Sequence, residues 1–258
     1  MIKKLIHYTW FSGEEMPDLI KKCIDFWHKY LPDYEFKLWD RAAAEAIDSV
    51  FLKEALSVKK WAFAADYVRL YAVYHEGGIY LDTDVELRSS FDPFLNHRMF
   101  IGKEHWLQLA QEFKPGLSVY LTSHCFGAEA GHPFLKRCLD YYAERHFIVS
   151  KSPDLPEWIR YDHAILPYIQ ACIAKADGYN HRPKVKGIQM LRDGLAIYPS
   201  AYFDGESSDK NCVVIHHCLG AWRVVVNTEK ESNFVTKIKS LVAKTLYHFD
   251  IALFRLRG

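Results

Sequence analysis

The chain has 258 residues, enough to bury a sizeable core, and its hydrophobic share of 50% and charged share of 25% are those of an ordinary soluble globular protein. A formal net charge of +1 supplies no overall field that would attract a nucleic acid. The cysteines form no CxxC pair and match no zinc or disulfide spacing, so we expect reduced thiols in a cytosolic protein.

The N-terminal residues are basic and then apolar, but His7, Ser12 and Glu14 interrupt the apolar run. We therefore expect neither a cleavable signal peptide nor a membrane-spanning segment of about 18 apolar residues.

The first elements follow a strand–helix–strand order. Residues 3–10 read as an apolar strand, a helix follows Pro17, and residues 34–39 alternate as a second strand that ends on Asp40. This order is typical of a parallel α/β sheet, whose ligands bind at the carboxyl ends of the strands. Trp10 and Asp40 are at those ends.

Residues 41–56 form a helical stretch, and residues 59–75 give the strongest helical pattern of the chain, with Gly77 as its C-terminal cap. Asp66 and Arg69 are three residues apart on this helix and share a face. Two interpretations are open: a local ion pair, or two side chains that line a ligand cleft.

The segment from Gly77 to Glu86 is the centre of the prediction. Two glycines predict a turn, and residues 79–81 a short buried strand that ends at Asp82 and Asp84. Alternation along an extended backbone would point both carboxylates to one side, where they repel each other unless a cation lies between them. Mg²⁺ or Mn²⁺ would accept these oxygens together with those of a diphosphate.

The second half predicts further short elements. Strands are expected at 125–128, around Ile188 and Ile197, and at 213–215 before the pair His216–His217; helices are expected at 133–146 and 162–176, and a loop at 150–156.

The C-terminal segment 231–258 carries apolar residues at helical spacing, and six basic residues but only two acidic ones follow from Lys230 onward. Such a basic amphipathic helix fits an anionic membrane surface, and it equally fits a terminal helix docked on the domain with solvated lysines.

The Asp-x-Asp pair alone fits three kinds of site. An EF-hand loop fails, because Leu87 stands where that loop needs glycine. An aspartyl-phosphate phosphatase fits the buried strand and Val85, but the later acidic pair that it needs at a strand end is missing. A glycosyltransferase that holds a sugar nucleotide through a metal is the third interpretation, and a non-catalytic saccharide-binding module is a further alternative.

Five motifs in order resemble the glycosyltransferases of family 32, the capsule-type and yeast-mannosyltransferase-like enzymes that share a core with the glucosylating clostridial toxins. They are IHYTWFSG at 6–13, PDYE at 32–35, ADYVRL at 65–70, GGIYLDTD at 77–84 and IHH…GAW at 215–222. The chain departs from the family pattern at Ala221, where a serine is common, and in lacking an evident Gly-Pro element near Tyr161.

The resemblance implies a GT-A fold over residues 1–230, an α/β domain with a mixed, mainly parallel sheet flanked by helices. It implies that Trp10 stacks on the nucleotide base and that Trp222 closes over the diphosphate. The donor would also contact Asp66, Arg69, Tyr80 and Asp82. The metal would be held by Asp84 and His216, preferred to His217, together with Asp82; the catalytic set would be Asp82, Asp84 and Arg69.

The function so implied is a retaining hexosyltransferase that depends on Mn²⁺ or Mg²⁺. The expected donor is a UDP-hexose, with GDP-mannose second, and the expected acceptor is a saccharide or lipid-linked oligosaccharide in the synthesis of cell-surface or capsular polysaccharide. We expect the protein in the cytoplasm, with the basic tail touching the inner face of the membrane.

Overall fold

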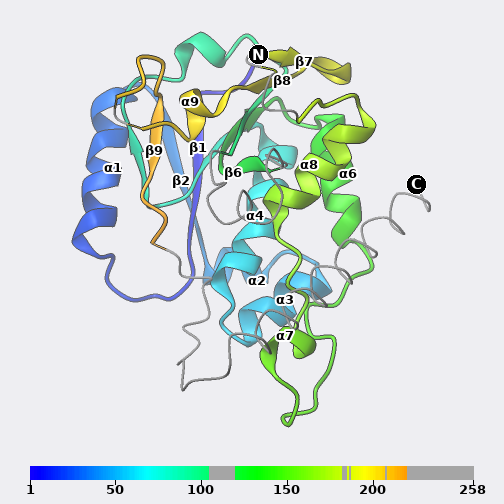
Figure 1. Cartoon of the computed structure of the whole chain (residues 1–258). Helices are drawn as coiled ribbons and strands as arrows, with labels where there is room; N and C mark the ends of the chain where they lie inside the picture. Colours follow the sequence, from blue (N-terminus) through cyan, green and yellow to red (C-terminus); the bar gives the residue numbers. More distant parts are fainter. Residues whose placement is uncertain (105–119, 182–184, 186, 207, 220–258) are drawn as a thin grey trace, which may run out of the picture.

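The computed structural model describes residues 1–104, 120–181, 185, 187–206 and 208–219, with only the main chain at position 158 (Figure 1). Within these residues a seven-stranded sheet has the order β2-β1-β3-β6-β5-β8-β7, and a separate ribbon pairs β4 with β9. The strands are β1 Leu5–Trp10, β2 Glu35–Asp40, β3 Gly78–Leu81, β4 Val85–Leu87, β5 Met99–Lys103, β6 Leu121–Ala128, β7 Gln189–Met190, β8 Leu195–Tyr198 and β9 Val214–His216. The helices are α1 Asp18–Tyr30, α2 Arg41–Glu45, α3 Val50–Ser57, α4 Trp61–Glu76, α6 Pro133–Tyr142, α7 Glu157–Arg160, α8 Leu166–Ala176 and α9 Ser200–Phe203, with short 3₁₀ turns η1 Asp92–Phe94 and η2 Arg192–Gly194.

The sheet is mixed and mainly parallel, as predicted. Strand β1 runs parallel to β2 and β3, and β5 runs parallel to β8. Strand β6 is antiparallel to both β3 and β5, and β7 is antiparallel to β8. Strands β1, β2, β3, β5 and β8 therefore share one direction, and their carboxyl ends lie along one edge of the sheet.

Helices α4, α6 and α8 lie on one side of the sheet, while α1 and the β4–β9 ribbon lie on the other (Figure 1). The apolar side chains form two buried clusters accordingly, with Tyr80 of β3 in one and its neighbours Ile79 and Leu81 in the other. On the α1 side, the indole of fully buried Trp27 donates a 2.7 Å hydrogen bond to the Val85 carbonyl oxygen. Helix α1 thereby anchors the ribbon that follows Asp84.

Two glycines bring β3 against β1. Gly77 has a φ of 70° and its amide caps α4 by donating to the Val73 carbonyl, which confirms the predicted cap. Gly78 has a φ of 107°, and a Cβ there would lie 2.5 Å from the carbonyl oxygen of Leu5. Only glycine permits this close approach of the Gly78 backbone to Leu5. The approach sets the position at which the chain enters the candidate site.

Some predicted boundaries differ from those in the structure, in one case because capping residues divide a predicted helix. The predicted helical stretch 41–56 is two helices, because Asp40 caps α2 by accepting from the Ala43 amide and Ser49 caps α3. The helices predicted at 162–176 and 133–146 are shorter, starting at Leu166 and ending at Tyr142. Strand β6 is longer than the predicted 125–128. The predicted tail helix at 231–258 lies outside the described residues.

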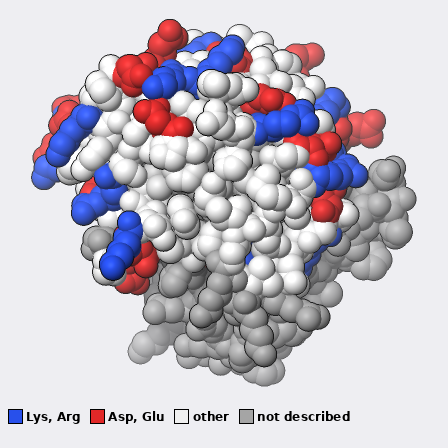
Figure 2. Space-filling model, turned by 90° about the horizontal axis from the view of Figure 1, so that it is seen from above, with Lys and Arg blue, Asp and Glu red and all other residues white. Residues whose placement is uncertain are grey.

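The six cysteines, Cys23, Cys125, Cys138, Cys172, Cys212 and Cys218, are all free. None of the helices in the described ranges has the length and apolar character needed to cross a membrane. On the face seen in Figure 2, basic and acidic side chains are interspersed around the margin, so this face presents no continuous basic area.

His7 ties the first two strands to the end of α4. It is fully buried, its Nδ1 accepts a 3.1 Å hydrogen bond from the indole of Trp39, and its Nε2 donates to the Gly77 carbonyl oxygen at 2.9 Å. Because Nδ1 must keep a lone pair for the indole, the ring is neutral. Burial lowers the pKa of His7 below its usual value of 6.5.

We expect acid to destabilise the protein partly through His7. Below pH 6.5 His7 binds a proton in the unfolded chain but stays neutral in the folded one. The contribution of neutral His7 to the free energy of unfolding is therefore complete above that pH and is lost as the pH falls. Urea unfolding at pH 7.5 and 5.5 measures the loss. His7→Gln, whose amide can both accept and donate, should show a smaller loss, whereas His28→Gln at an exposed position should match the wild type. An unchanged loss in His7→Gln would exclude this origin.

Candidate metal and donor site

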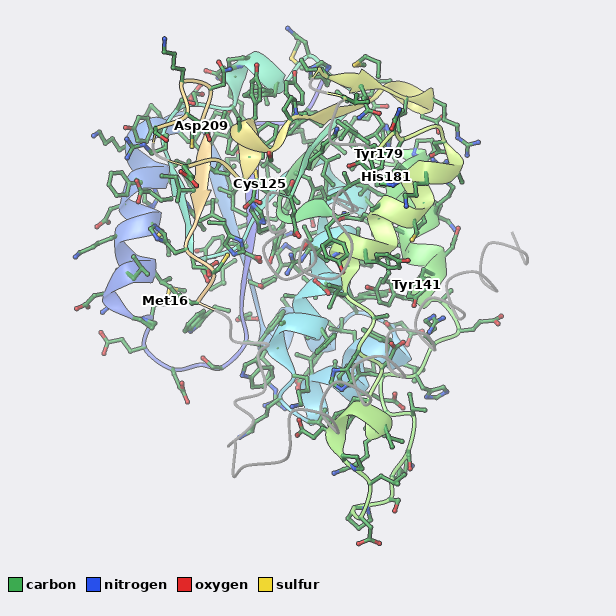
Figure 3. The ribbon with its side chains drawn as sticks, viewed as in Figure 1. Met16, Cys125, Tyr141, Tyr179, His181 and Asp209 are labelled. Carbon is green, nitrogen blue, oxygen red and sulfur yellow. The ribbon has the colours of Figure 1, made fainter. Side chains whose placement is uncertain are left out.

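The candidate site lies where the described carboxyl edge of the sheet meets the ribbon. Helix α4 supplies Asp66 and Arg69, the turn after β3 supplies Asp82 and Asp84, and β9 supplies His216. Figure 3 shows Cys125 in the middle of the fold, on β6, between the ribbon and the α4 side. The neighbouring β6 residues Ser123 and His124 face this same region through contacts with Arg69 and His216.

Asp82 and Asp84 are brought together by a turn and not by strand alternation. The Val85 amide donates to the Asp82 carbonyl oxygen at 3.1 Å, which closes a reverse turn over residues 82–85. The predicted extended backbone is therefore wrong at this point. The gathering of the carboxylates is nevertheless found: one oxygen of each and one nitrogen of His216 all lie within 4.8 Å of one another.

Asp84 is held from the ribbon side. Register pairs Val85 with His216, which places His216 Nε2 at 3.3 Å from Asp84 Oδ1, and the Leu219 amide donates to Oδ2 at 2.9 Å. Although burial favours the neutral acid, these hydrogen bonds and the charge of His216 hold the pKa of Asp84 at about 2. In return, and against the effect of burial, Asp84 raises the pKa of His216 well above its usual value.

The two adjacent histidines face different partners. His217 Nε2 lies 3.1 Å from Glu86 Oε2, beside the exposed Arg88, while His216 stands next to Asp84. His216 is the last residue of β9 and His217 the first residue after it, and their side chains point to different partners. The geometry thus groups His216, and not His217, with the carboxylates.

Asp82 is held from the helix side. Arg69 Nη2 lies 3.2 Å from Asp82 Oδ1, and the Tyr80 hydroxyl donates to the same oxygen at 2.9 Å. The Arg69 guanidinium lies over the Tyr80 ring, 4.7 Å from its centroid, and donates to the Ser123 carbonyl oxygen at 2.7 Å. Tyr80 is fully buried and its hydroxyl also meets Thr9 Oγ1 at 3.1 Å, so in this structure it orients Asp82 from beneath.

Asp66 and Arg69 form the local ion pair of the first interpretation, while their lining of a ligand cleft stays a prediction. Their side chains form an ion pair at 3.4 Å, and Arg69 also reaches Asp82. The Leu166 amide donates to Asp66 Oδ2 at 3.2 Å, which connects α4 to the start of α8. Burial raises the pKa of Asp66 to about 6, against the opposing charge of Arg69.

Of the two tryptophans expected around the donor, only Trp10 lies within the described residues. Trp10 ends β1, is partly exposed, and donates through its indole Nε1 to the Glu14 carbonyl oxygen at 2.8 Å. Its ring is therefore held at the carboxyl edge of the sheet, where the stacking role remains a prediction. Trp222 lies outside the described residues.

Three polar side chains were not singled out from the sequence. His124 on β6 stacks on His216 with ring centroids 4.1 Å apart, and Asp204, which follows α9, lies near both. Loss of solvation raises the pKa of Glu104, after β5, to about 8, and the charge of Asp204 adds to this. No local pattern marks these residues, because each is brought in by strand pairing or loop packing.

The residues present fit a divalent metal. Two carboxylate oxygens and one imidazole nitrogen suit Mn²⁺, and bonds of about 2 Å would place such ligand atoms about 3–4 Å apart, within the observed 4.8 Å limit. Asp84 is ionised at neutral pH, and His216, whose pKa Asp84 raises, would give up its ring proton to bind the ion.

Comparison with known proteins gives this geometry a family context. Residues 17–101 match the model of a family described as a glycosyltransferase sugar-binding region containing a DXD motif. The chain is similar to inositol phosphoceramide mannosyltransferase 3 of Schizosaccharomyces pombe, with 34% identity over 141 residues, 52% of this chain and 35% of the relative. It is also similar to mannosyl phosphorylinositol ceramide synthase SUR1 of Saccharomyces cerevisiae, with 30% identity over 147 residues, 54% of this chain and 34% of the relative.

Among solved structures, the PaToxG glycosyltransferase aligns with a TM-score of 0.46 and 17% identity over 69% of this chain and 71% of that one. The chain covers only about a third of the length of the two curated relatives. The family resemblance indicated by the sequence motifs is confirmed for residues 17–101, which match the family model of the DXD-containing glycosyltransferase sugar-binding region.

Proposed function

We propose that this protein is a retaining, metal-dependent glycosyltransferase that moves a hexose from a nucleotide sugar to a hydroxyl of a saccharide or glycolipid acceptor. The observation that carries the proposal is the gathering of Asp82, Asp84 and His216 at the edge of the sheet, with both aspartates inside the segment that matches the sugar-binding family. Retention of the anomeric configuration rests on the family resemblance.

In this function the protein side chains bind and orient the donor. Asp84 and His216 would hold Mn²⁺ or Mg²⁺, with Asp82 as a further ligand, and the bound metal would neutralise charge on the departing diphosphate. Arg69 keeps Asp82 in place and lies beside Asp66 at the floor of the site. The predicted contacts of Trp10, Asp66, Arg69 and Tyr80 with the donor belong to this proposal.

The rival functions fit less well. A phosphatase that forms an aspartyl phosphate needs a free nucleophilic oxygen, but Asp82 Oδ1 meets Arg69 and Tyr80 and Asp82 Oδ2 lies 3.5 Å from Arg69 Nη1. A simple saccharide-binding module has no need for a carboxylate pair with an adjacent histidine. Both rivals would leave nucleotide binding insensitive to Mn²⁺.

For the donor we put GDP-mannose ahead of the UDP-hexose indicated by the toxin-like motifs, because both curated relatives are named for mannosyl transfer. Thermal unfolding with GDP or UDP, each with and without Mn²⁺, separates the two. A nucleotide at 100 times its Kd stabilises the folded state by about 2.7 kcal/mol, which raises Tm by about 5–10 °C for a chain of this size. We expect the shift with GDP and Mn²⁺ together; silence with both nucleotides would contradict the whole proposal.

We place the acceptor at the inner face of a membrane. The relatives are named for mannosylation of inositol phosphoceramides, and the C-terminal segment 231–258 of this chain is basic and amphipathic. The acceptor is either such a lipid or a capsular-type glycan on a lipid carrier. Incubating each with the enzyme and the donor, and measuring sugar transfer, distinguishes the two. Flotation with anionic liposomes should recover the full chain but not a chain ending at residue 230. Equal recovery of the two would remove the tail from the proposal.

A further inference from the structure

One face of the His216 ring is covered by a second imidazole, that of His124. The two rings are stacked, with their centroids 4.1 Å apart and an interplanar angle of 28°. The nitrogen lone pairs of each imidazole lie in the plane of its own ring, so the nitrogens of a stacked pair do not converge on one ion. What His124 offers to His216 is therefore the flat face of its ring.

The His124 ring is itself firmly held. His124 is on β6, in the interior of the sheet between β3 and β5, and only 2% of it is exposed. Its Nε2 donates to the Phe203 carbonyl oxygen at 2.7 Å, which fixes the orientation of the ring, because a carbonyl can only accept. Phe203 on α9 is fully buried, and its ring stacks on that of Phe100 with centroids 5.1 Å apart. The packing of α9 thus extends to the imidazole of His124.

The His216 ring depends on such support. His216 is the last residue of β9, in a ribbon of only two strands. Pairing with β4 places its main chain, but it does not fix rotation of the ring about the Cβ–Cγ bond, for which histidine has a broad range. In the structure Nε2 lies 3.3 Å from Asp84 Oδ1, and Nδ1 lies 3.5 Å from Cys218 Sγ. Rotation of the ring would turn Nε2 away from Asp84 and drive the ring edge into the face of His124.

We propose that His124 is a positioning residue, whose ring holds the imidazole of His216 in the orientation in which Nε2 faces the carboxylate pair. His216 is then oriented for metal binding before the ion arrives. This inference rests on the proposed function in one respect, namely that a metal binds between His216 and the carboxylates. Histidine meets both requirements at position 124, because its ring offers a flat face and its Nε2 donates to the Phe203 carbonyl.

Two substitutions separate these requirements. His124→Gln keeps a donor for the Phe203 carbonyl and removes the ring, so we expect Mn²⁺ binding to weaken at least about 10-fold. Pulsed EPR of the bound Mn²⁺ should then lose the signal of a directly bound imidazole nitrogen. His124→Phe keeps an aromatic face and leaves the carbonyl without its donor. We expect it to lower Tm, but to retain the nitrogen signal and a Mn²⁺ affinity within about threefold of the wild type.

A residue that served only the packing of α9 would give the reverse order. His124→Phe would then be the variant that weakens Mn²⁺ binding, and His124→Gln would bind like the wild type. His132→Gln is the matched control, because His132 is fully buried and its Nε2 donates to the Asp193 carbonyl oxygen at 3.0 Å, next to α6. It should lower Tm and leave Mn²⁺ binding and the nitrogen signal unchanged.

Wild-type Mn²⁺ affinity and an intact nitrogen signal in His124→Gln would overturn the positioning role. So would a wild-type protein whose bound Mn²⁺ carries no imidazole nitrogen, since no histidine ligand is then present to be oriented. The proposed function fails separately. If Mn²⁺ binding follows the expected order in the His124 variants while neither GDP nor UDP binds, the proposed transfer reaction is refuted and the positioning role stands.

Discussion

Asp84→Asn is expected to abolish Mn²⁺ binding at the carboxylate pair and to lower donor hydrolysis and sugar transfer by about 10³-fold, or about 4 kcal/mol of transition-state stabilisation. The substitution keeps the size of the side chain and can keep the hydrogen bond from the Leu219 amide. It removes the charge that pairs with His216 and that a divalent cation requires. Turnover with GDP-mannose and Mn²⁺ binding by titration are the two measurements.

Glu86→Gln is the matched control for this change. Glu86 is two residues farther along, on β4, and faces His217 and Arg88 in place of the carboxylate pair. The variant loses the same charge two residues away from Asp84, so it should retain Mn²⁺ binding and turnover. If Asp84→Asn kept wild-type turnover, the metal role of the pair would be refuted.

Arg69→Met is expected to destabilise the fold by about 3–5 kcal/mol, the cost of leaving buried charges without their partner. Arg69 has 5% of its side chain exposed and faces Asp66 and Asp82, whose side chains are 11% and 23% exposed. Burial disfavours the charge of Arg69, but Asp82 and Asp66 more than compensate and raise its pKa. Urea unfolding at pH 7.5 measures the loss.

Arg41→Met serves as the control, because Arg41 pairs with Glu45 on the surface, where such pairs contribute about 0.3–0.5 kcal/mol. Adding Asp66→Asn to Arg69→Met should recover part of the lost stability, since one of the unpaired charges is then removed. A loss below about 1 kcal/mol in Arg69→Met would show that water reaches this cluster and compensates the aspartates.

Elements governed by neighbours along the chain were predictable. Helix α4 has a long apolar stripe and a glycine at its end, and both features act within a few residues, so its bounds were predicted to within about two residues. The same holds for the apolar strand β1 and the alternating strand β2, and the strand–helix–strand order also predicted their parallel pairing. The break between α2 and α3 was missed because the cap at Ser49 competes with an otherwise continuous helical pattern.

The candidate site likewise contains residues that were predictable from the sequence and contacts that were not. The Asp-x-Asp pair was found because it follows a buried strand pattern, whereas Asp66 and Arg69, noted for their shared helix face, and His216 were assigned to the site through the family motifs. That Arg69 joins Asp66 to Asp82 depends on how α4 packs against β3, and a reverse turn presents the two carboxylates. Local alternation could not show this, because a turn and a strand place residues i and i+2 differently.

Charge and residue type along the chain were thus enough to indicate a cation site next to a buried strand. The partners of that site come from residues distant in sequence: His216 meets Asp84 through pairing of β4 with β9, and His124 and Asp204 join them from β6 and the end of α9. Such contacts arise from the burial of apolar faces, which acts over the whole fold and leaves no periodic trace around the residues it brings together. The tertiary structure alone therefore decided that the imidazole of His216 lies between the carboxylate pair on one side and His124 and Asp204 on the other.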